Sequence, residues 1–270
     1  MQLPQLVNMF GADLQRRYGE KIHKLTLHGG FGCPNRDGTL GRGGCTFCNV
    51  ASFADEAMYR QALAQSAMVG LCVGTRPDCV PAAALDLLTG YREQGYEVWL
   101  ELGLQTAHDK TLKRINRGHD FRCYQQTARL ARQRGLKVCC HLIVGLPGET
   151  QRDHLLTLQQ VTETGVDGIK LHPLHVVTGS TLARAWQAGR LPELALEDYT
   201  VSAGEMIRHT PGEVVYHRLS ASARRPTLLA PLWCENRWSG MQAVGAYLQR
   251  HGGQGSALDE KRRYRPGMPL

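Results

Sequence analysis

The feature that most constrains the fold of this chain is a repeated alternation of short apolar stretches with helical segments. Apolar stretches of strand length lie at 24–28, 68–75, 96–102, 137–144, 166–172 and 212–218. Apolar residues at helical spacing lie at 81–95, 109–115, 124–134, 150–164 and 197–209. Strands that alternate with helices in this way predict a parallel sheet with right-handed crossover connections.

These units are too few for the eight strands of a complete TIM barrel. We therefore expect an α/β fold of the partial (β/α)6 TIM-like barrel type, and a doubly wound sheet is the alternative. In both arrangements the chemistry belongs at the carboxyl ends of the strands. We expect one domain over residues 1–251, followed by a polar, basic and mobile C-terminal tail over 252–270.

Composition narrows the class of protein. With 270 residues, 42% hydrophobic and 21% charged, the chain is neither disordered nor collagenous. No window approaches the roughly 18 apolar residues of a membrane-spanning helix, and the N-terminus lacks the apolar run of a signal peptide, so we expect a cytoplasmic protein without membrane association. The formal charge of +8 allows attraction to a polyanion, but it also fits an ordinary basic surface.

Three of the nine cysteines fall in one glycine-rich loop after the first expected strand. Cys33, Cys45 and Cys48 have the spacing C-x11-C-x2-C, which lets a loop wrap around one metal centre. Three cysteines can hold a [4Fe–4S] cluster and leave one iron open to another ligand, whereas a structural zinc site is normally closed by four ligands. Zinc is therefore the alternative, with His28 or Cys234 as its fourth ligand.

The end of this loop, Cys45-Thr46-Phe47-Cys48, resembles the cluster motif of the radical S-adenosylmethionine (SAM) superfamily. Its first spacing is longer than is usual there, but long spacings occur in the branch related to the elongator catalytic subunit. Over nearly the whole chain the sequence is most similar to the bacterial YhcC/YtqA-like family. The similarity lies in HKLTLHGGFGCPNRDG, GRGGCTFCNVASFADEA, VGLCVGTRPDCV, WLELGLQTAHDKTLKRINRGHDF, HLIVGLPGET, GVDGIKLHPLH and SASARRPTLLAPLWCENRW.

The resemblance implies two cofactors, a [4Fe–4S] cluster held by Cys33, Cys45 and Cys48, and SAM chelated by the open iron. One electron, from a donor such as a flavodoxin or ferredoxin, would cleave SAM to methionine and a 5′-deoxyadenosyl radical that abstracts hydrogen from a substrate. In such enzymes the protein orients the cofactors and excludes water. The resemblance specifies no catalytic residue for the substrate.

It also implies residues that bind SAM. Phe47 would cover the cluster near the adenine, although a loop aromatic can equally plug the core. Gly103 and Gln105 resemble the G-x-Q motif at a strand end of relatives, and Arg117 follows at the spacing seen there. Relatives hold the cofactor with this Gln and Arg, an amide suiting ribose hydroxyls and a guanidinium suiting a carboxylate. A solvated helix end is the alternative for Arg117. Gly145 lies at the strand end that contacts adenine, where glycine permits close backbone approach.

The sequence departs from the family pattern at two strand ends. His141 occupies a place where relatives commonly carry an acid, and Gly74 stands where some carry a glutamate. The ribose contacts would therefore have to come from Glu101, Thr75 or Arg76.

A longer segment is present in the family between the positions of Ala57 and Met58. It contains a strand whose end usually meets the amino group of the methionine moiety. Either this segment is omitted from the sequence, which we favour because its flanks match so closely, or this protein binds the methionine end differently.

Residues at the last strand ends are candidates for contact with a substrate. Lys170, His172, Tyr216, His217 and Arg218 are expected to face the barrel mouth, where they would orient a substrate or form a polar plug. The basic charge and the elongator resemblance favour an RNA substrate. The alternatives are a radical enzyme acting on a small metabolite and a non-catalytic zinc or iron–sulfur protein that binds nucleic acid.

Overall fold

The main sheet consists of parallel strands in sequential order. The structure, a computed structural model, describes residues 2–24, 45–47, 61, 63–64 and 68–259. Within these residues five strands form the sheet, namely β1 (Gly70–Thr75), β2 (Glu97–Gln105), β3 (Lys137–Val144), β4 (Gly168–Pro173) and β6 (Val215–Arg218). A doubly wound sheet reverses its strand order at a switch point, and the order β1-β2-β3-β4-β6 does not. The expected α/β barrel-type arrangement is confirmed for these strands, while Leu25–His28 of the expected first strand lie outside the described residues.

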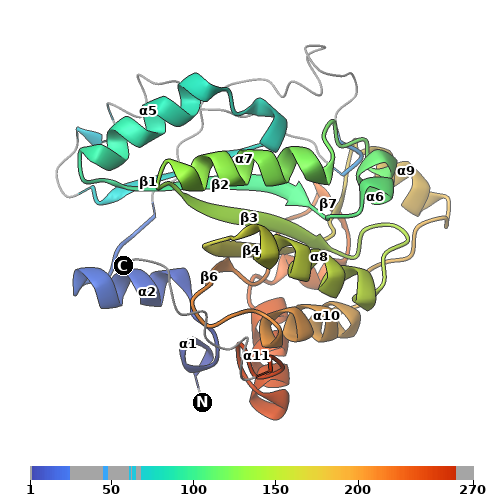
Figure 1. Cartoon of the computed structure of the whole chain (residues 1–270). Helices are drawn as coiled ribbons and strands as arrows, with labels where there is room; N and C mark the ends of the chain where they lie inside the picture. The colour runs from blue at the N-terminus through green and yellow to red at the C-terminus, as the bar shows by residue number, and fades with distance from the viewer. Residues whose placement is uncertain (1, 25–44, 48–60, 62, 65–67, 260–270) are drawn as a thin grey trace.

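Helices cover the outer face of this sheet. The long ones are α5 (Ala82–Glu93), α7 (Phe121–Gln133), α8 (Gln151–Thr164) and α10 (Leu196–Arg208). Figure 1 shows α5 and α7 in the upper part of the view and α8 and α10 below them, and the arrowheads of β2 and β3 point toward α6 (Asp109–Arg114) and α9 (Thr181–Gln187). The carboxyl ends of the strands, where a site is expected, therefore lie on the side of α6 and α9.

Local sequence signals set several boundaries. α7 begins at Phe121 because the side chain of Asp120 accepts a hydrogen bond from the N–H of Cys123 at 2.8 Å. β2 extends past the predicted end at Leu102, since Gln105 still pairs with β3. The periodicity did not predict several other elements, which are α1 (Leu3–Leu6), α2 (Phe10–Tyr18), β5 (Val176–Val177), β7 (Leu228–Ala230), α11 (Ser239–His251) and the 3₁₀ turns η1 (Pro77–Cys79) and η2 (Leu232–Glu235).

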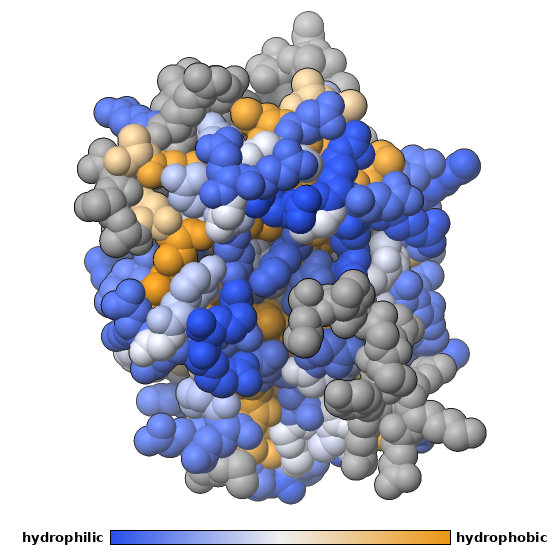
Figure 2. All heavy atoms as spheres, turned by 60° about the vertical axis from the view of Figure 1, so that its left-hand side comes forward, coloured by the Kyte–Doolittle hydropathy of each residue, from blue (hydrophilic) through white to orange (hydrophobic). Residues whose placement is uncertain are grey.

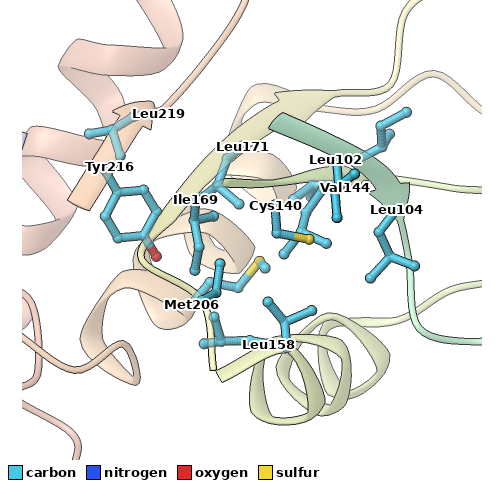
Figure 3. Close-up of a cluster of buried hydrophobic side chains, with 14 of the residues drawn as sticks. Leu102, Leu104, Cys140, Val144, Leu158, Ile169, Leu171, Met206, Tyr216 and Leu219 are labelled. Atoms are coloured by element: carbon cyan, nitrogen blue, oxygen red, sulfur yellow. The ribbon is translucent and has the colours of Figure 1, made fainter. Parts of the chain in front are cut away.

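The main hydrophobic core lies between the sheet and its helices. Leu102, Cys140, Ile169 and Tyr216 are register neighbours on four strands and are almost completely buried. Figure 3 shows them beside Leu158 of α8 and Met206 of α10. Burying each large apolar side chain stabilises the fold by about 1.5–3 kcal/mol. The expectation that Tyr216 faces the barrel mouth is wrong, because its position on β6 turns it to the helices, where its hydroxyl lies 2.7 Å from that of Thr210.

A second cluster fills the amino end of the barrel interior. Trp99, Cys139 and Val215 are buried there together, and Phe10 of α2 packs against them. The Phe10 ring stacks on that of His217 with centroids 3.9 Å apart. α2 therefore closes the amino end of the barrel, which leaves the carboxyl end for ligands.

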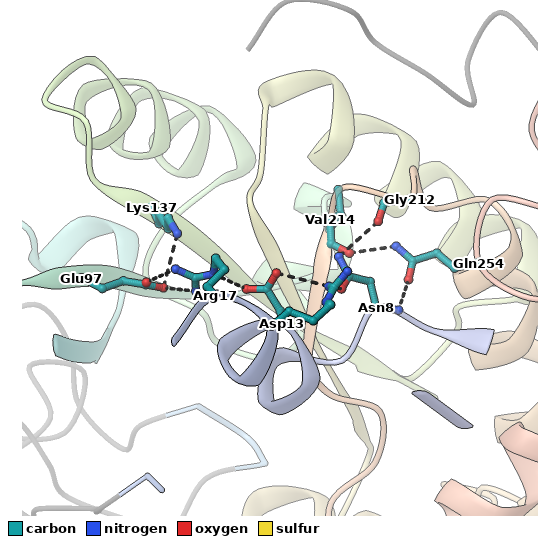
Figure 4. A network of polar contacts seen from close by, with 9 residues as sticks. Asn8, Asp13, Arg17, Glu97, Lys137, Gly212, Val214 and Gln254 are labelled. Carbon is teal, nitrogen blue, oxygen red and sulfur yellow. Dashed lines mark hydrogen bonds and ion pairs between the residues drawn. The ribbon is translucent and has the colours of Figure 1, made fainter. Parts of the chain in front are cut away.

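Polar contacts fasten α2 to the sheet. Arg17 pairs with Glu97 at the start of β2, and Lys137 at the start of β3 approaches the same carboxylate at 3.3 Å (Figure 4). The two ends of the described chain also meet, since the N–H of Gln254 donates to the carbonyl oxygen of Leu6 at 2.8 Å. Residues at the start of the predicted tail thus lie against the domain, and the domain boundary at Gly252 stays a prediction; 260–270 lie outside the described residues.

The surface shown in Figure 2, which carries the α2 and α5 side of the molecule, is mostly hydrophilic, with hydrophobic side chains in limited areas between polar ones. Among the described helices, none combines the length and the apolar character needed to cross a bilayer.

Candidate active site

Cys45, one of the three predicted cluster ligands, lies at the carboxyl end of the sheet. Its side chain is buried, and the residue after it is held on two sides. The N–H of Thr46 donates to the carbonyl oxygen of Ile115 after α6 at 3.0 Å, and the N–H of Leu182 in α9 donates to the carbonyl oxygen of Thr46 at 3.1 Å. This part of the loop is thereby anchored between α6 and α9. Cys33 and Cys48 lie outside the described residues.

Arg117 connects Cys45 to the end of β2. Its Nη1 lies 3.3 Å from the Cys45 Sγ, and its Nη2 donates to the carbonyl oxygen of Gly103. The guanidinium thus places hydrogen-bond donors on both the sulfur and the strand end. The predicted cofactor residue Arg117 and the predicted ligand Cys45 are therefore in direct contact.

Gly103 makes room for this arrangement. A Cβ atom at Gly103 would lie 2.7 Å from Nη2 of Arg117 and 2.9 Å from Nε2 of Gln105, distances at which a neighbour has to move. Gln105 itself has a φ of 80°, which is rare for a residue with a side chain. This explains the glycine of the G-x-Q motif, because only glycine lets the Gln105 amide and the Arg117 guanidinium lie together at the end of β2.

A buried histidine missed by the sequence analysis supports Arg117. His119 accepts a hydrogen bond from Nε of Arg117 at 3.0 Å. Burial and the positive charge of Arg117 lower the pKa of His119 to about 4, so the ring is neutral near pH 7 and its nitrogen is free to accept. The sequence signal was present, because His119 follows Arg117 by two residues in NRGHDF.

The other predicted SAM-binding residues near β1 and Cys45 make contacts within the protein. Arg76 is 3% exposed and forms an ion pair with Asp78, with Nε and Oδ1 2.9 Å apart. Thr75 ends β1 beside Gly103, whose hypothetical Cβ would lie 3.5 Å from its carbonyl oxygen. Phe47 is partly buried and packs against the main core, as the core-plug interpretation expects. A role of these residues in binding SAM stays a prediction.

Glu101 forms the centre of the barrel interior. Its Oε1 lies 3.1 Å from Nζ of Lys24 and 3.4 Å from Nδ1 of His217. Its Oε2 pairs with Lys170 and lies 3.5 Å from Nε2 of His141. Burial alone would raise the pKa of Glu101, but the two neighbouring histidine rings and the charges of the two lysines outweigh it, so the pKa lies well below its usual value. This carboxylate is charged and paired within the protein, and its contact with a ribose stays a prediction.

Three residues in this interior also have metal-ligating atoms close together. The ligating atoms of Cys72, Glu101 and His217 lie within 4.8 Å of one another. Lys24 and Lys170 contact the same carboxylate, and their positive charges oppose a cation there. We therefore assign no metal to this cluster.

Lys170 and His217 both point into the barrel interior, where they contact Glu101. His217 does not face the mouth as expected, because it stacks on Phe10 at the amino end. Lys170 pairs in register with Arg218, and Ile169 pairs with Tyr216, so His217 is an extra residue in β6. This bulge explains how two consecutive residues, His217 and Arg218, both reach the interior. Gly168 leaves room for the inward ring of His217, because a Cβ at this position would lie 2.9 Å from the Trp99 ring and 3.0 Å from the His217 ring.

Gly145 and His141, the predicted cofactor residues of β3 and its end, have structural reasons of their own. Gly145 has a φ of 93°, and a Cβ on it would lie 2.9 Å from the side chain of Leu194. Glycine is thus required by the backbone turn and by Leu194 packing. Burial lowers the pKa of His141 to about 4, despite its neighbour Glu101, so at neutral pH this ring is uncharged and does not replace the acid of relatives. Adenine contact at Gly145 and cofactor contact at His141 stay predictions.

Known proteins resemble this chain in sequence and in fold. The pattern of the Radical SAM superfamily matches residues 54–161, and that of the Radical_SAM C-terminal domain matches residues 166–250. Protein YhcC of Escherichia coli strain K12 is 65% identical over 311 positions, which cover 100% of this chain and 99% of that protein. The chain therefore belongs to the radical SAM superfamily, and the resemblance to the YhcC/YtqA-like family is confirmed.

Two further similarities concern the elongator branch. The solved structure of the archaeal Methanocaldococcus infernus Elp3 with an N-terminal deletion matches with a TM-score of 0.61 at 22% identity, over 69% of this chain and 43% of that chain, which supports the fold. A tRNA uridine(34) acetyltransferase of Dehalococcoides mccartyi is 35% identical over 52% of this chain and 30% of that protein. This chain thus resembles only part of each of these larger proteins.

The alignment with YhcC also bears on the segment between Ala57 and Met58. It spans 311 positions, 41 more than the 270 residues of this chain. YhcC therefore contains residues without a counterpart here, in agreement with a segment that is longer in the family.

Proposed function

We propose that this protein is a radical SAM enzyme whose [4Fe–4S] cluster is held by Cys33, Cys45 and Cys48. The observation that carries the proposal is the contact between Cys45 and Arg117 beside the Gly103-x-Gln105 strand end. A buried cysteine sulfur held at the carboxyl end of the sheet, with a donor 3.3 Å away, fits a ligand of an iron–sulfur cluster. When bound, the cluster and SAM would supply a 5′-deoxyadenosyl radical that abstracts hydrogen, with the electron coming from a flavodoxin or ferredoxin type of donor.

The residues of this chain would bind and orient the cofactors. Arg117 is held by Gly103 and His119, so its guanidinium has one orientation at the strand end. The amide of Gln105 and this guanidinium offer donors for hydroxyl and carboxylate groups of SAM. α2 and the cluster around Trp99 close the opposite end of the barrel, which keeps water from entering there.

The test is SAM cleavage by protein that is purified without oxygen, reconstituted with iron and sulfide, and reduced with dithionite. We expect 5′-deoxyadenosine from the wild type and from Cys123→Ala, which alters a partly buried cysteine of α7 outside the cluster loop. Cys45→Ala should produce none. A full cluster without cleavage would contradict the proposal, and a colourless, zinc-loaded protein would favour the nucleic-acid-binding alternative.

We propose in addition that the substrate is an RNA. The net charge of +8 and the partial similarity to a tRNA uridine(34) acetyltransferase support this choice. Binding through phosphates releases counterions, so affinity for tRNA should fall steeply between about 50 and 200 mM salt. Weak binding that is insensitive to salt would instead favour a small metabolite as the substrate.

A further inference from the structure

Arg218 is a cation in the barrel interior whose partner is not found among the described residues. It ends β6, at the carboxyl end of the sheet. Its Nε is shielded from solvent and has no hydrogen-bond partner in the described part of the chain. A guanidinium removed from water without a partner is unfavourable, so this position calls for an anion.

Glu101 attracts Arg218 through the interior, but no ion pair between the two side chains is found in the described residues. Its two oxygens are already engaged with Lys24, Lys170, His141 and His217. Lys170, the register partner of Arg218, therefore forms its ion pair with Glu101. Positive charge thus exceeds negative charge around the end of β6 in the described residues.

Two histidines lie beside Arg218 in the barrel interior. His172 lies two residues after Lys170 on β4, and its ring centroid is 4.5 Å from that of His175. Nε2 of His175 is also shielded and without a hydrogen-bond partner among the described residues. Lys170 and His172 share one face of β4, and Lys170 pairs with Arg218, so the register places His172 next to Arg218, with His175 against His172. Burial first, and then the charge of Arg218, lower the pKa of both histidines.

We propose that Arg218, His172 and His175 form a binding site for an oxyanion, a phosphate or carboxylate group of the substrate. Guanidinium groups bind both kinds of oxyanion through two parallel hydrogen bonds. An imidazole ring that is neutral without the anion becomes a further donor when it takes up a proton together with the anion. The proposal rests on the proposed function in one respect, since it takes the ligand to be the substrate. The site is separate from Arg117, which lies at the end of β2 and contacts Cys45.

The test is the thermal stability of the purified protein, which requires neither a cluster nor SAM. Unfolding is followed while sodium phosphate or sodium acetate is added, with sodium chloride at equal ionic strength as the reference. A ligand that binds only the folded state raises Tm in a saturable way. We expect such a rise for the wild type, and a loss of affinity of about tenfold or more for Arg218→Met.

Arg224→Met is the matched control, because Arg224 is an exposed arginine six positions further along the chain. It should respond to the anions like the wild type. In chloride alone Arg218→Met should be at least as stable as the wild type, since it removes an unpaired charge. His175→Gln provides a second variant, in which anion affinity should also fall.

The anions distinguish the two kinds of ligand. A saturable response to phosphate identifies a phosphate-bearing substrate, and a response to acetate alone identifies a carboxylate-bearing one. No saturable response to either anion, or an Arg218→Met protein less stable than the wild type in chloride, would overturn the proposal. Because the assay involves no radical chemistry, its failure and the failure of SAM cleavage can be told apart.

Discussion

At the scale of single residues, glycine placement controls whether Arg117 can reach Cys45. Gly103→Ala would put a Cβ 2.7 Å from Nη2 of Arg117, and the end of this flexible side chain is what has to move. Moving a binding group by about 1 Å can cost on the order of a hundredfold in rate. We expect iron content and the yield of 5′-deoxyadenosine to fall together, on the order of tenfold, while the urea midpoint changes little.

Gly90→Ala is the control for this substitution. A Cβ at Gly90 in α5 meets nothing within 4 Å, so alanine should stabilise the helix by up to about 1 kcal/mol and leave cluster loading unchanged. Wild-type iron content and cleavage in Gly103→Ala would show that close approach at this glycine is irrelevant to the site.

At the scale of elements, the docking of α2 depends on one carboxylate. Burial alone would raise the pKa of Glu97, but hydrogen bonds from Arg17 and Trp99 and the charge of Lys137 lower it to about 2 from its usual value of 4.5. A depressed carboxyl pKa stabilises the folded state above the unfolded pKa, and this contribution is lost as the pH falls from about 4.5 through 2. Glu97→Gln should therefore lower the free energy of unfolding at pH 7, by about 1–2 kcal/mol after allowing for solvent screening at Arg17.

Urea unfolding at several pH values measures the free energy of unfolding of both proteins. The difference between wild type and Glu97→Gln should shrink as the pH approaches 2, whereas Glu163→Gln on the exposed side of α8 should match the wild type throughout. A difference that stays constant down to pH 2 would mean that the Glu97 carboxylate is not the group responsible.

Elements with a strong local period could be predicted, and those defined by distant contacts could not. β3 lies at its expected residues, and α8 begins one residue after its expected start, because their apolar spacing is set within one element. β5 has two residues, too few for a period, and it forms only by pairing with β7 more than fifty residues away. Residues of the site that are close in sequence could be predicted in the same way. Gly103, Gln105 and Arg117 lie within fifteen positions of one another and were recognised as a motif.

The pairing of Glu101, by contrast, was not foreseen. Its partners Lys170 and His217 come from two other strands, and a bulge in β6 sets the orientation of His217. Neither partner has a spacing that relates it to Glu101 in sequence. Such a pairing depends on strand register, which apolar patterning does not encode for the inner face of a barrel.

At the scale of the whole molecule, the two matched sequence patterns share one sheet. β3 belongs to residues 54–161 and β4 to residues 166–250, yet the two strands are neighbours from Cys139 and Gly168 to Val144 and Pro173. One hydrophobic core includes residues from both parts, such as Leu102 and Met206. Cutting the chain between them would expose a strand edge and half of that core on each piece.

We therefore expect that fragments 1–164 and 165–270 do not fold separately, although the cut falls after the end of α8. Each fragment alone should lack a cooperative urea transition by circular dichroism, and the full chain should unfold in one transition that is the same by tryptophan fluorescence. Trp99 reports on the first part and Trp233 on the second, so both parts are monitored. A cooperative transition in either fragment would mean that the boundary between the two patterns is also a boundary of folding. A single transition of the whole chain would instead show that both parts fold together. Glu101 lies in the first part and Arg218 in the second, so the barrel interior would then form only when the complete sheet folds.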